Sequence, residues 1–517
     1  MVYSSSYTRT LTNMKVANLR KSAARLTESF FIPKEFVFTN NQGKEVKVNF
    51  DNGERNCIKE DHRLQKDLLI DKIVYVCDKH NISRRAYHQL SQEYSGLPTS
   101  YQVFKRKQEV NAQFDIHECV GLVGVWKSLE KRLCLPNTHS IYNDPLKLKI
   151  FESAEVNVKL TGDGTTFGKR MHVMNFAFSI IGENHCAGEG SHLLAVIKVP
   201  EKYDQLSLAL QPLIEEVSVL KKIKVEGHDI SVNKFLGGDL KFLNLVMGIQ
   251  SFGAKYCCLW CTCPSELRWD LSKKCSMTDI ADGARTIDSI IACQSKKRFE
   301  DKKGCFAAPL FPTIPVENVV PDTLHLFLRL SDQLVSQLVT ELLEMDNISK
   351  RVAKKGLESC HHVAKFQSFV NSLGIEWQFF LEKGNNKISS RDFTGPEHKK
   401  VLENIKLDQL VPNHPKLQYL QKLWSEVLPL MHYLQKELTS SEIDEFQKRA
   451  RDWLHLFVTV YPSKDVTPYM HNLVSHFPKA LRLHGNLAQF SQQGLEKLND
   501  RTTVWYYRSS HHIGVRR

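Results

Sequence analysis

The chain has 517 residues, of which 42% are hydrophobic and 25% are charged, with 70 Lys and Arg against 57 Asp and Glu. This length and composition supply material for roughly two to four domains with buried cores, which excludes a wholly disordered protein. No apolar run approaches the ~18 residues that span a bilayer, so we expect a soluble protein without a membrane partner. The net charge of +13 favours an anionic partner, nucleic acid before membrane.

The thirteen cysteines are unevenly distributed along the chain. The first residues lack the apolar segment of a secretory signal, so we expect a reducing compartment in which disulfides do not form. Nine cysteines are isolated and need no special explanation. The other four, Cys257, Cys258, Cys261 and Cys263, fall within seven positions and do need one.

The segment from about residue 64 to 108 is predicted to form three short helices, with Gly96-Leu97-Pro98 breaking the chain before the third. The second and third helices carry positive charge, which is compatible with a helix-turn-helix unit on DNA phosphates. An ordinary three-helix cluster with a solvated basic face is the competing interpretation. The candidate DNA-binding residues are Arg84, Arg85, Lys105, Arg106 and Lys107.

The hydrophobic period changes to two at about residue 155. The alternating run there and the β-rich runs 171–181 and 191–198 predict consecutive antiparallel strands. A helix over about 205–222 and a strand pair within 223–236 follow. Together these elements predict an α/β layer.

The chain after Asp239 is predicted to be helical for most of 240–480. A long helix is expected after Pro321, with one apolar stripe that we interpret as core packing. The stripe consists of Phe327, Ser331, Leu334, Leu338 and Leu342.

Three carboxylate residues are candidates for a catalytic or metal-binding site. Asp163 lies between two glycines after the first alternating run, and Asp239 follows Gly237-Gly238 after a later strand. A turn at Asp163 and a helix N-cap at Asp239 explain these residues without function, whereas bare glycines would let a metal or a phosphate backbone approach. Glu496 lies on a polar helix face that a solvated surface would also explain. The same face carries Gln492, Asn499 and Thr503.

A zinc site is the stronger candidate. Cys258 and Cys261 form a CxxC knuckle, and His471 and His476 form a histidine pair at i, i+5. Zn2+ takes four soft or borderline ligands in a tetrahedron, which these two pairs supply. We expect one structural zinc ion and disfavour a catalytic one, because no open position is implied. The alternative is two buried thiols and two surface histidines, and the other two clustered thiols leave the choice of sulfur ligands open.

Taken in chain order, these pieces resemble the Transib transposases and their domesticated relative, the catalytic subunit of the V(D)J recombination-activating recombinase. The resemblance spans about 155–508 and rests on order and spacing, since a lone Asp-Gly or CxxC is common. It implies an α/β fold whose RNase H-like core, a mixed sheet, is split by a large helical, zinc-bearing insertion. The implied domains are a helical N-terminal DNA-binding and dimerisation region (1–150), the first part of the core (151–255), the insertion (256–480) and the last core helix with its acidic residue (481–517).

The resemblance also implies the roles of individual residues. Asp163, Asp239 and Glu496 match the acidic triad, and the two cysteines and two histidines of the zinc candidate match the zinc ligands. Asp322 and His325 fall in a further matching segment, from which we expect no more than an indirect role. Two Mg2+ or Mn2+ ions on the triad would stabilise the attacking and leaving oxygens at phosphorus.

By resemblance the chain is a DDE-type transposase or endonuclease of a transposable element, which nicks DNA and performs strand transfer in DNA recombination. A nuclear location follows, with double-stranded DNA as transposon ends and target, a homodimer, and an accessory subunit left open. The interval from Asp163 to Asp239 is shorter than in the vertebrate recombinase, no RING-like zinc domain is evident, and 21 residues after Glu496 leave little room for a C-terminal domain. A domesticated, catalytically inactive, zinc-stabilised DNA-binding protein is therefore the alternative.

Overall fold

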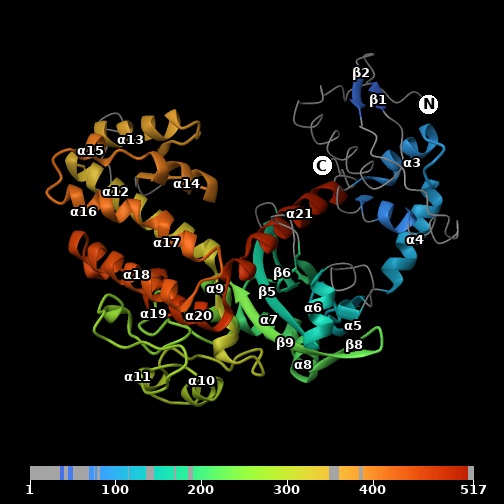
Figure 1. Ribbon diagram of the computed structural model, residues 1–517, viewed down its shortest axis with the longest axis horizontal. Coiled ribbons are helices and arrows are strands. Elements are labelled where there is room, and N and C mark those ends of the chain that lie inside the picture. Colours follow the sequence, from blue (N-terminus) through green and yellow to red (C-terminus); the bar gives the residue numbers. More distant parts are fainter. Residues whose placement is uncertain are drawn as a thin grey trace. The chain divides into compact units, whose positions relative to one another are not determined.

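The computed structural model divides into two compact units, Met1–Asp115 and Ile116–Arg517 (Figure 1). In the described part of the chain, no helix is both long and apolar enough to cross a membrane. The structure describes residues 35–39, 45–49, 69–74, 76–77, 82–113, 116–134, 145–167, 171–183, 190–348, 360–382 and 388–510.

The first unit combines a two-stranded antiparallel hairpin with short helices. Residues 69–74 and 76–77 are helical, and Ser83 caps the next helix by accepting a 3.1 Å hydrogen bond from Ala86 N. The three short helices predicted here are confirmed, whereas the hairpin was not predicted. The named elements are β1 (Glu35–Thr39), β2 (Glu45–Asn49), α3 (Arg84–Glu93) and α4 (Ser100–Gln113). The helices share a core of Ile70, Ile73, Val74, Cys77, Tyr87 and Val103.

Within the described residues, the second unit contains an eight-stranded mixed sheet. Its order is β10-β9-β5-β6-β7-β4-β3. β8 pairs with the first residues of β9, from His228 to Ser231. The strands are β3 (Ile116–Glu118), β4 (Gly124–Lys127), β5 (Glu155–Phe167), β6 (Met171–Ile180), β7 (His192–Ile197), β8 (Lys222–Val225), β9 (His228–Gly238) and β10 (Val319–Pro321).

The directions of the strands determine which strand ends, and therefore which side chains, lie beside one another at the edge of the sheet. β5, β6 and β7 form an antiparallel meander, as predicted, while β9 and then β10 add on the other side of β5 and run parallel to it. β5, β7 and β9 therefore end at the same edge of the sheet. Thr161 of β5 pairs with Gly237 of β9, so Asp163 and Asp239, each two residues further on, occupy neighbouring positions.

The N-terminal boundary differs from the expected helical region over 1–150. β3 and β4 extend the sheet of the second unit, because β4 pairs with the edge of β7 and satisfies backbone groups there. The helix predicted over 205–222 is also divided, since Pro212 stands in the first turn of a new helix and cannot donate a backbone hydrogen bond. Helices that accompany the sheet are α5 (Leu129–Cys134), α6 (Pro145–Ser153), α7 (Tyr203–Ala209) and α8 (Gln211–Val219).

The chain after β9 is predominantly helical, as predicted. The apolar stripe of α12 is buried at Ser331, Leu334, Leu338 and Leu342, which confirms its role in the core. A short antiparallel hairpin of β11 (Phe379–Leu381) and β12 (Ile388–Ser390) and the strand β10 were not predicted. The helices are α9 (Leu240–Val246), α10 (Ile287–Gln294), α11 (Phe299–Lys302), α12 (Thr323–Met345), α13 (His361–Ser372), α14 (Gly395–Asn404), α15 (Leu407–Leu410), α16 (Leu417–Ser425), α17 (Val427–Tyr433), α18 (Ser440–Val460), α19 (Pro468–Ser475) and α20 (Phe477–His484).

The last helix, α21 (Gln493–Ser510), returns to the sheet and runs along β5 (Figure 1). Its Leu495 and Leu498 are buried against Ala177 of β6. The helical region from α10 to α20 is therefore an insertion in the chain between two parts that pack on the same sheet.

Candidate carboxylate site and zinc-type centre

Asp163 and Asp239 are brought together by the parallel pairing of β5 and β9. Asp163 lies within β5, opposite Asn175 of β6. Asp239 follows β9 directly and is the N-cap of α9, since its Oδ1 accepts a 2.7 Å hydrogen bond from Phe242 N. The N-cap alternative for Asp239 is thus correct, and it leaves the second carboxylate oxygen available.

Buried polar bonds fix the start of α21 against the sheet. Lys159 of β5 donates from Nζ to the carbonyls of Phe490 and Ser491, at 3.0 and 2.9 Å. Thr161 donates to Gln492 Oε1 at 2.6 Å. Burial lowers the pKa of Lys159 to about 8. These contacts join residues 331 and 332 positions apart in the sequence.

About two turns further along the chain, a second set of bonds from α21 reaches Asp163. Asn499 donates from Nδ2 to Asp163 Oδ2 at 2.6 Å, and Asn175 donates to Asn499 Oδ1 at 2.7 Å and to Thr502 at 3.0 Å. Asn499 is therefore buried, not part of the solvated helix surface considered from the sequence. Glu496 is the open member of this face, with 48% of its side chain exposed.

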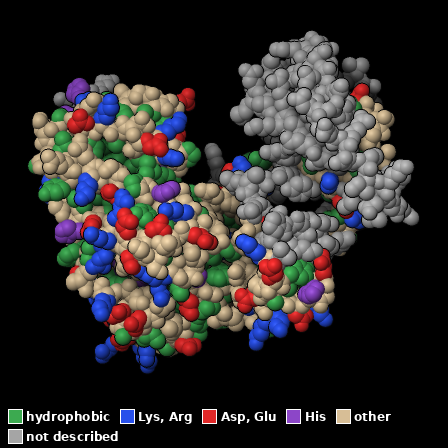
Figure 2. Space-filling model, in the orientation of Figure 1, with side chains coloured by type: hydrophobic (Ala, Val, Ile, Leu, Met, Phe, Trp, Pro, Cys, Tyr) green, Lys and Arg blue, Asp and Glu red, His purple; other side chains and the backbone are tan. Residues whose placement is uncertain are grey.

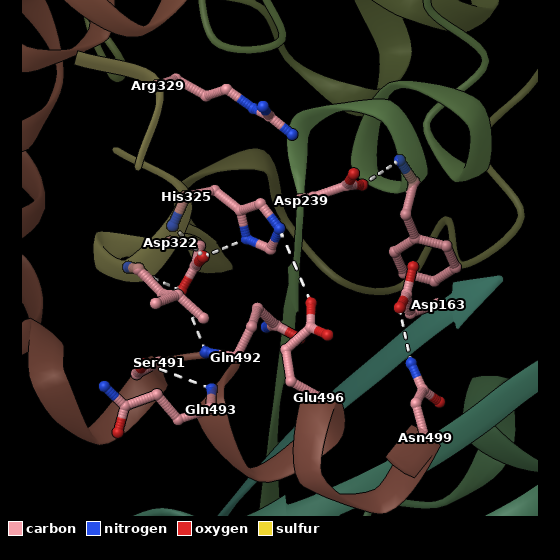
Figure 3. A network of polar contacts seen from close by, with 12 residues as sticks. Asp163, Asp239, Asp322, His325, Arg329, Ser491, Gln492, Gln493, Glu496 and Asn499 are labelled. Carbon is pink, nitrogen blue, oxygen red and sulfur yellow. Dashed lines mark hydrogen bonds and ion pairs between the residues drawn. The ribbon is translucent and has the colours of Figure 1, made fainter. Parts of the chain in front are cut away.

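Negative charge accumulates where these elements meet. Burial, together with the charges of Glu496, Asp239 and Glu201, raises the pKa of Asp163 to about 7. Burial also raises the pKa of Glu496, and Asp239 adds to that rise. Figure 3 shows the carboxyl groups of Asp163, Asp239 and Glu496 around one region, with Asp163 coming from β5, Asp239 following β9 and Glu496 rising from α21. The three predicted carboxylates are thus electrostatically coupled.

The carboxylates do not form a closed ligand group for one ion. Among the residues that the structure describes, their oxygens are not all within 4.8 Å of one another, a spacing that the Cys and His cluster described below does meet. The carboxylate site is consequently the more extended of the two.

Asp322 and His325 connect α12 to this site. Asp322 caps α12 by accepting from Leu324 N and His325 N, and it also accepts from Gln492 N at 3.0 Å. His325 Nδ1 lies 2.6 Å from Asp322 Oδ2, and its Nε2 lies 3.7 Å from Glu496 Oε1. Burial disfavours the imidazolium, but the hydrogen bond to Asp322 and the negative charges of Asp322, Asp239 and Glu496 together outweigh it, so the pKa of His325 is raised. His325 therefore bridges a buried aspartate and the exposed glutamate.

Three glycines of the site pack against the protein's own side chains. A Cβ at Gly238 would lie 2.5 Å from the ring of Phe242, and one at Gly162 would lie 2.6 Å from the same ring. A Cβ at Gly237 would lie 2.7 Å from Lys159 Cδ. The glycines make room for the protein's own side chains, which bring α9 and the Lys159 stem close to the sheet.

Glu201 is a member of the site that the sequence did not reveal. It follows β7 and forms an ion pair with Lys241 of α9. Its Oε2 lies 3.5 Å from the point where a Cβ on Gly164 would be. A carboxylate after an apolar run was visible in the sequence, but only the shared direction of β5 and β7 places it at the same edge.

The two cysteines and two histidines of the zinc candidate do meet. Cys258 and Cys261 lie in the loop after α9, His471 lies in α19, and His476 stands between α19 and α20. Cys258 Sγ is 3.2 Å from His476 Nε2, and Cys261 Sγ is 3.3 Å from His471 Nε2. All four are buried, with ligand atoms within 4.8 Å of one another, so the alternative of surface histidines is wrong. This cluster can hold a zinc ion.

Two buried arginines organise the cysteine loop. Arg285 donates from Nε to the carbonyls of Cys258 and Cys261, at 2.9 and 3.1 Å. Arg268 donates to Cys257 Sγ at 2.7 Å, which engages that thiol away from the cluster. Of the two other clustered thiols considered from the sequence, Cys263 is the one that lies near a ligand of the cluster, His471. Nothing in the sequence pattern marked Arg285 for this role.

The five candidate DNA-binding residues lie on α3 and α4, and several have partners within the first unit. Arg106 forms a 2.6 Å ion pair with Asp71. Arg84 and Lys107 both lie over the ring of Phe104, at 5.5 and 6.0 Å from its centroid. Lys105 is exposed and its Nζ lies 4.0 Å from Glu109 Oε1, and Arg85 is exposed.

Comparisons with known proteins supply no family. No protein-family model matches the chain, and no curated protein matches its sequence. Fold and site define the class: a mixed α/β protein with many helices, a mixed sheet and a buried Cys/His cluster able to hold zinc.

Proposed function

We propose that this chain is a DDE-type transposase or transposase-derived recombinase, similar to the Transib family, that nicks double-stranded DNA and performs strand transfer. The coupling of Asp163, Asp239 and Glu496 carries the proposal, because these residues lie 76 and 257 positions apart and contribute to one another's charge environment. Like charges held together are unfavourable unless a cation compensates them. Mg2+ and Mn2+ are hard cations that take such oxygen ligands.

The sheet supports the proposal of an RNase H-like core. Three antiparallel strands, β5 to β7, are followed by two strands parallel to β5, and the final helix returns to the same sheet after a long insertion. Each member of the proposed triad stands on one of these core elements: β5, the end of β9, and α21.

The proposed chemistry assigns a task to each residue at the sheet edge. Bound ions would stabilise the attacking and leaving oxygens of an in-line displacement at phosphorus. Asn499 holds one oxygen of Asp163 and so orients the carboxylate, while the cap bond of Asp239 does the same there. His325 lies beside Glu496 and sets its position. The spread of the three carboxylates suits two ions roughly 3.5–4 Å apart better than one.

The proposed partners are transposon-end and target DNA and a second copy of the chain, in the nucleus, with an accessory subunit left open. The net charge of +13 and the exposed Arg85 and Lys105 support an anionic partner. Figure 2 shows basic and acidic side chains interspersed over the visible face of the described helical part. That face alone therefore does not define a path for DNA.

A nicking assay tests the proposal. Purified protein is incubated with supercoiled DNA and Mg2+ or Mn2+, beside Asp163→Asn, Asp239→Asn and Glu496→Gln, which preserve side-chain size. We expect nicking by the wild type and a loss of more than ~100-fold in each variant, since even partners of metal ligands typically cost 10–100-fold. Asp229→Asn, at an exposed position near the start of β9, is the matched control and should cleave normally. Equal cleavage by wild type and triad variants would sink the proposal.

A zinc-stabilised DNA-binding protein without catalysis is the second candidate. The observation that favours it is the closed, buried Cys/His cluster, which serves folding whether or not the carboxylates are active. Salt-dependent DNA binding that is unchanged in the triad variants, with no cleavage in Mg2+ or Mn2+, would select this function over the enzyme.

A further inference from the structure

A second group of metal-binding side chains lies beside the zinc-type cluster. The ligand atoms of Cys263, Cys275 and His471 are all within 4.8 Å of one another. His471 belongs to both groups, and the side chain of Cys275 interacts with those of Cys261 and Cys263. Six side chains thus form one continuous set of soft and borderline ligands.

The segment that carries Cys275 has little apolar packing of its own. Between the cysteine loop and α10 the chain is made of turns and one short 3-10 helix, Ser265–Leu267. Met277 and Ala284 are its buried apolar residues. Irregular segments with small cores are commonly held by metal ions or disulfides. A metal ion bound by Cys275 would supply that link.

The second group is also open to solution on one side. A hollow of about 430 Å³ is lined by Cys261, Cys263 and Cys275, and Cys275 is partly exposed. The first cluster, by contrast, is buried at all four positions. The hollow gives an ion an entry path and leaves a free position facing water. Its lining also includes Lys273, Lys274 and Lys303.

We propose that Cys263 and Cys275 bind a second zinc ion next to the first, which makes the six side chains a two-metal centre. Cys263 and Cys275 serve the second ion, and the Cys261 thiolate, which interacts with Cys275, bridges the two ions. Cys258, His471 and His476 complete the coordination of the first ion. Four thiolates balance the charge of two Zn2+ ions, as a mostly buried centre requires. The second ion keeps an open position toward the hollow.

Metal titration of the full-length chain tests the proposal independently of DNA cleavage. Metal-free protein is titrated with Co2+ while the absorption of thiolate-bound cobalt is followed. We expect saturation at two equivalents for the wild type and at one for Cys263→Ser/Cys275→Ser. The matched control Cys293→Ser changes a partly buried cysteine of α10 outside both groups and should keep two. Saturation of the wild type at one equivalent overturns the proposal, as does a double variant that still binds two.

Thiol alkylation of the wild type gives a second readout that does not depend on the folding of the double variant. The protein is loaded with one or two equivalents of Zn2+, treated with iodoacetamide, and analysed by mass spectrometry. We expect the second equivalent to protect Cys263 and Cys275 specifically. If both thiols react equally at one and at two equivalents, no second ion is bound there and the proposal is wrong.

Discussion

The carboxylate site and the zinc-type centre both gather residues from distant parts of the chain, but they are built differently. At the Cys/His centre four buried ligands lie within 4.8 Å of one another, so the site is closed. At the sheet edge the carboxylates are spread, Glu496 is about half exposed, and burial together with neighbouring like charge raises the pKa of Asp163. A closed site is typical of a structural ion. An open site with unfavourable like charges is typical of ions that also bind a substrate.

The largest expected effect breaks the closed site. Cys258→Ser or His476→Ala removes a buried ligand, so we expect loss of about one zinc equivalent or more per chain and unfolding of the helical insertion. Structural zinc sites contribute on the order of 10 kcal/mol of apparent binding energy, all of it coupled to folding. Elemental analysis and limited proteolysis provide the measurement, with Cys293→Ser as the control. Fully folded, zinc-free wild-type protein would contradict a structural role.

An intermediate effect tests the charge strain of the open site. The raised pKa of Asp163 means that the folded state binds the proton more tightly between pH ~4 and ~7, so stability without metal falls as pH rises through that window. Asp163→Asn removes this loss, and we expect it to be more stable than the wild type at pH 8 by on the order of 1–3 kcal/mol. Urea unfolding of the zinc-loaded protein without added Mg2+ or Mn2+, at pH 4 and pH 8, measures this difference. An equal difference at both pH values would contradict the electrostatic cause.

Added Mn2+ sharpens the same experiment. It should stabilise the wild type at pH 8 and have a much smaller effect on Asp163→Asn, because the variant lacks a ligand charge.

The smallest effect separates two roles of one residue. Asp239 caps α9, so Asp239→Ala should cost about 0.5–2 kcal/mol of stability, whereas Asp239→Asn, which keeps an N-cap oxygen, should cost much less. Both variants should lose the nicking activity to the same extent if the negative charge of Asp239 is needed to bind the metal ion. Retention of activity in Asp239→Asn would mean that the residue acts only as a cap.

The sequence predicted those features that are local or that depend on spacing. Alternation identified β5, β-rich apolar runs identified β6 and β7, and the CxxC knuckle with its histidine pair identified the buried cluster. The three residues of β10 are too few to show a period, and they become a strand because β9 offers an unpaired edge. Arg285 was missed for a related reason, since its role is to bond to carbonyls that only the folded loop presents.

The three carboxylates of the sheet-edge site could be predicted from the sequence, but the residues that surround them could not. Asp163, Asp239 and Glu496 could be selected by order along the chain, whereas Glu201 depends on strand direction. The packing role of the glycines beside Asp239 could not be predicted from the sequence, because their neighbours, Phe242 and Lys159, are brought there by the fold.

The buried Lys159 bonds have a consequence for the order of folding. They attach the start of α21 to β5 across 331 residues, so this contact has one of the highest sequence separations in the second unit. Contacts of long range form late, after the loop between them has been closed. A chain emerging from the ribosome therefore holds Asp163 and Asp239 together well before Glu496 arrives. Completion of the carboxylate site reports that the entire insertion has been made and the last helix has docked.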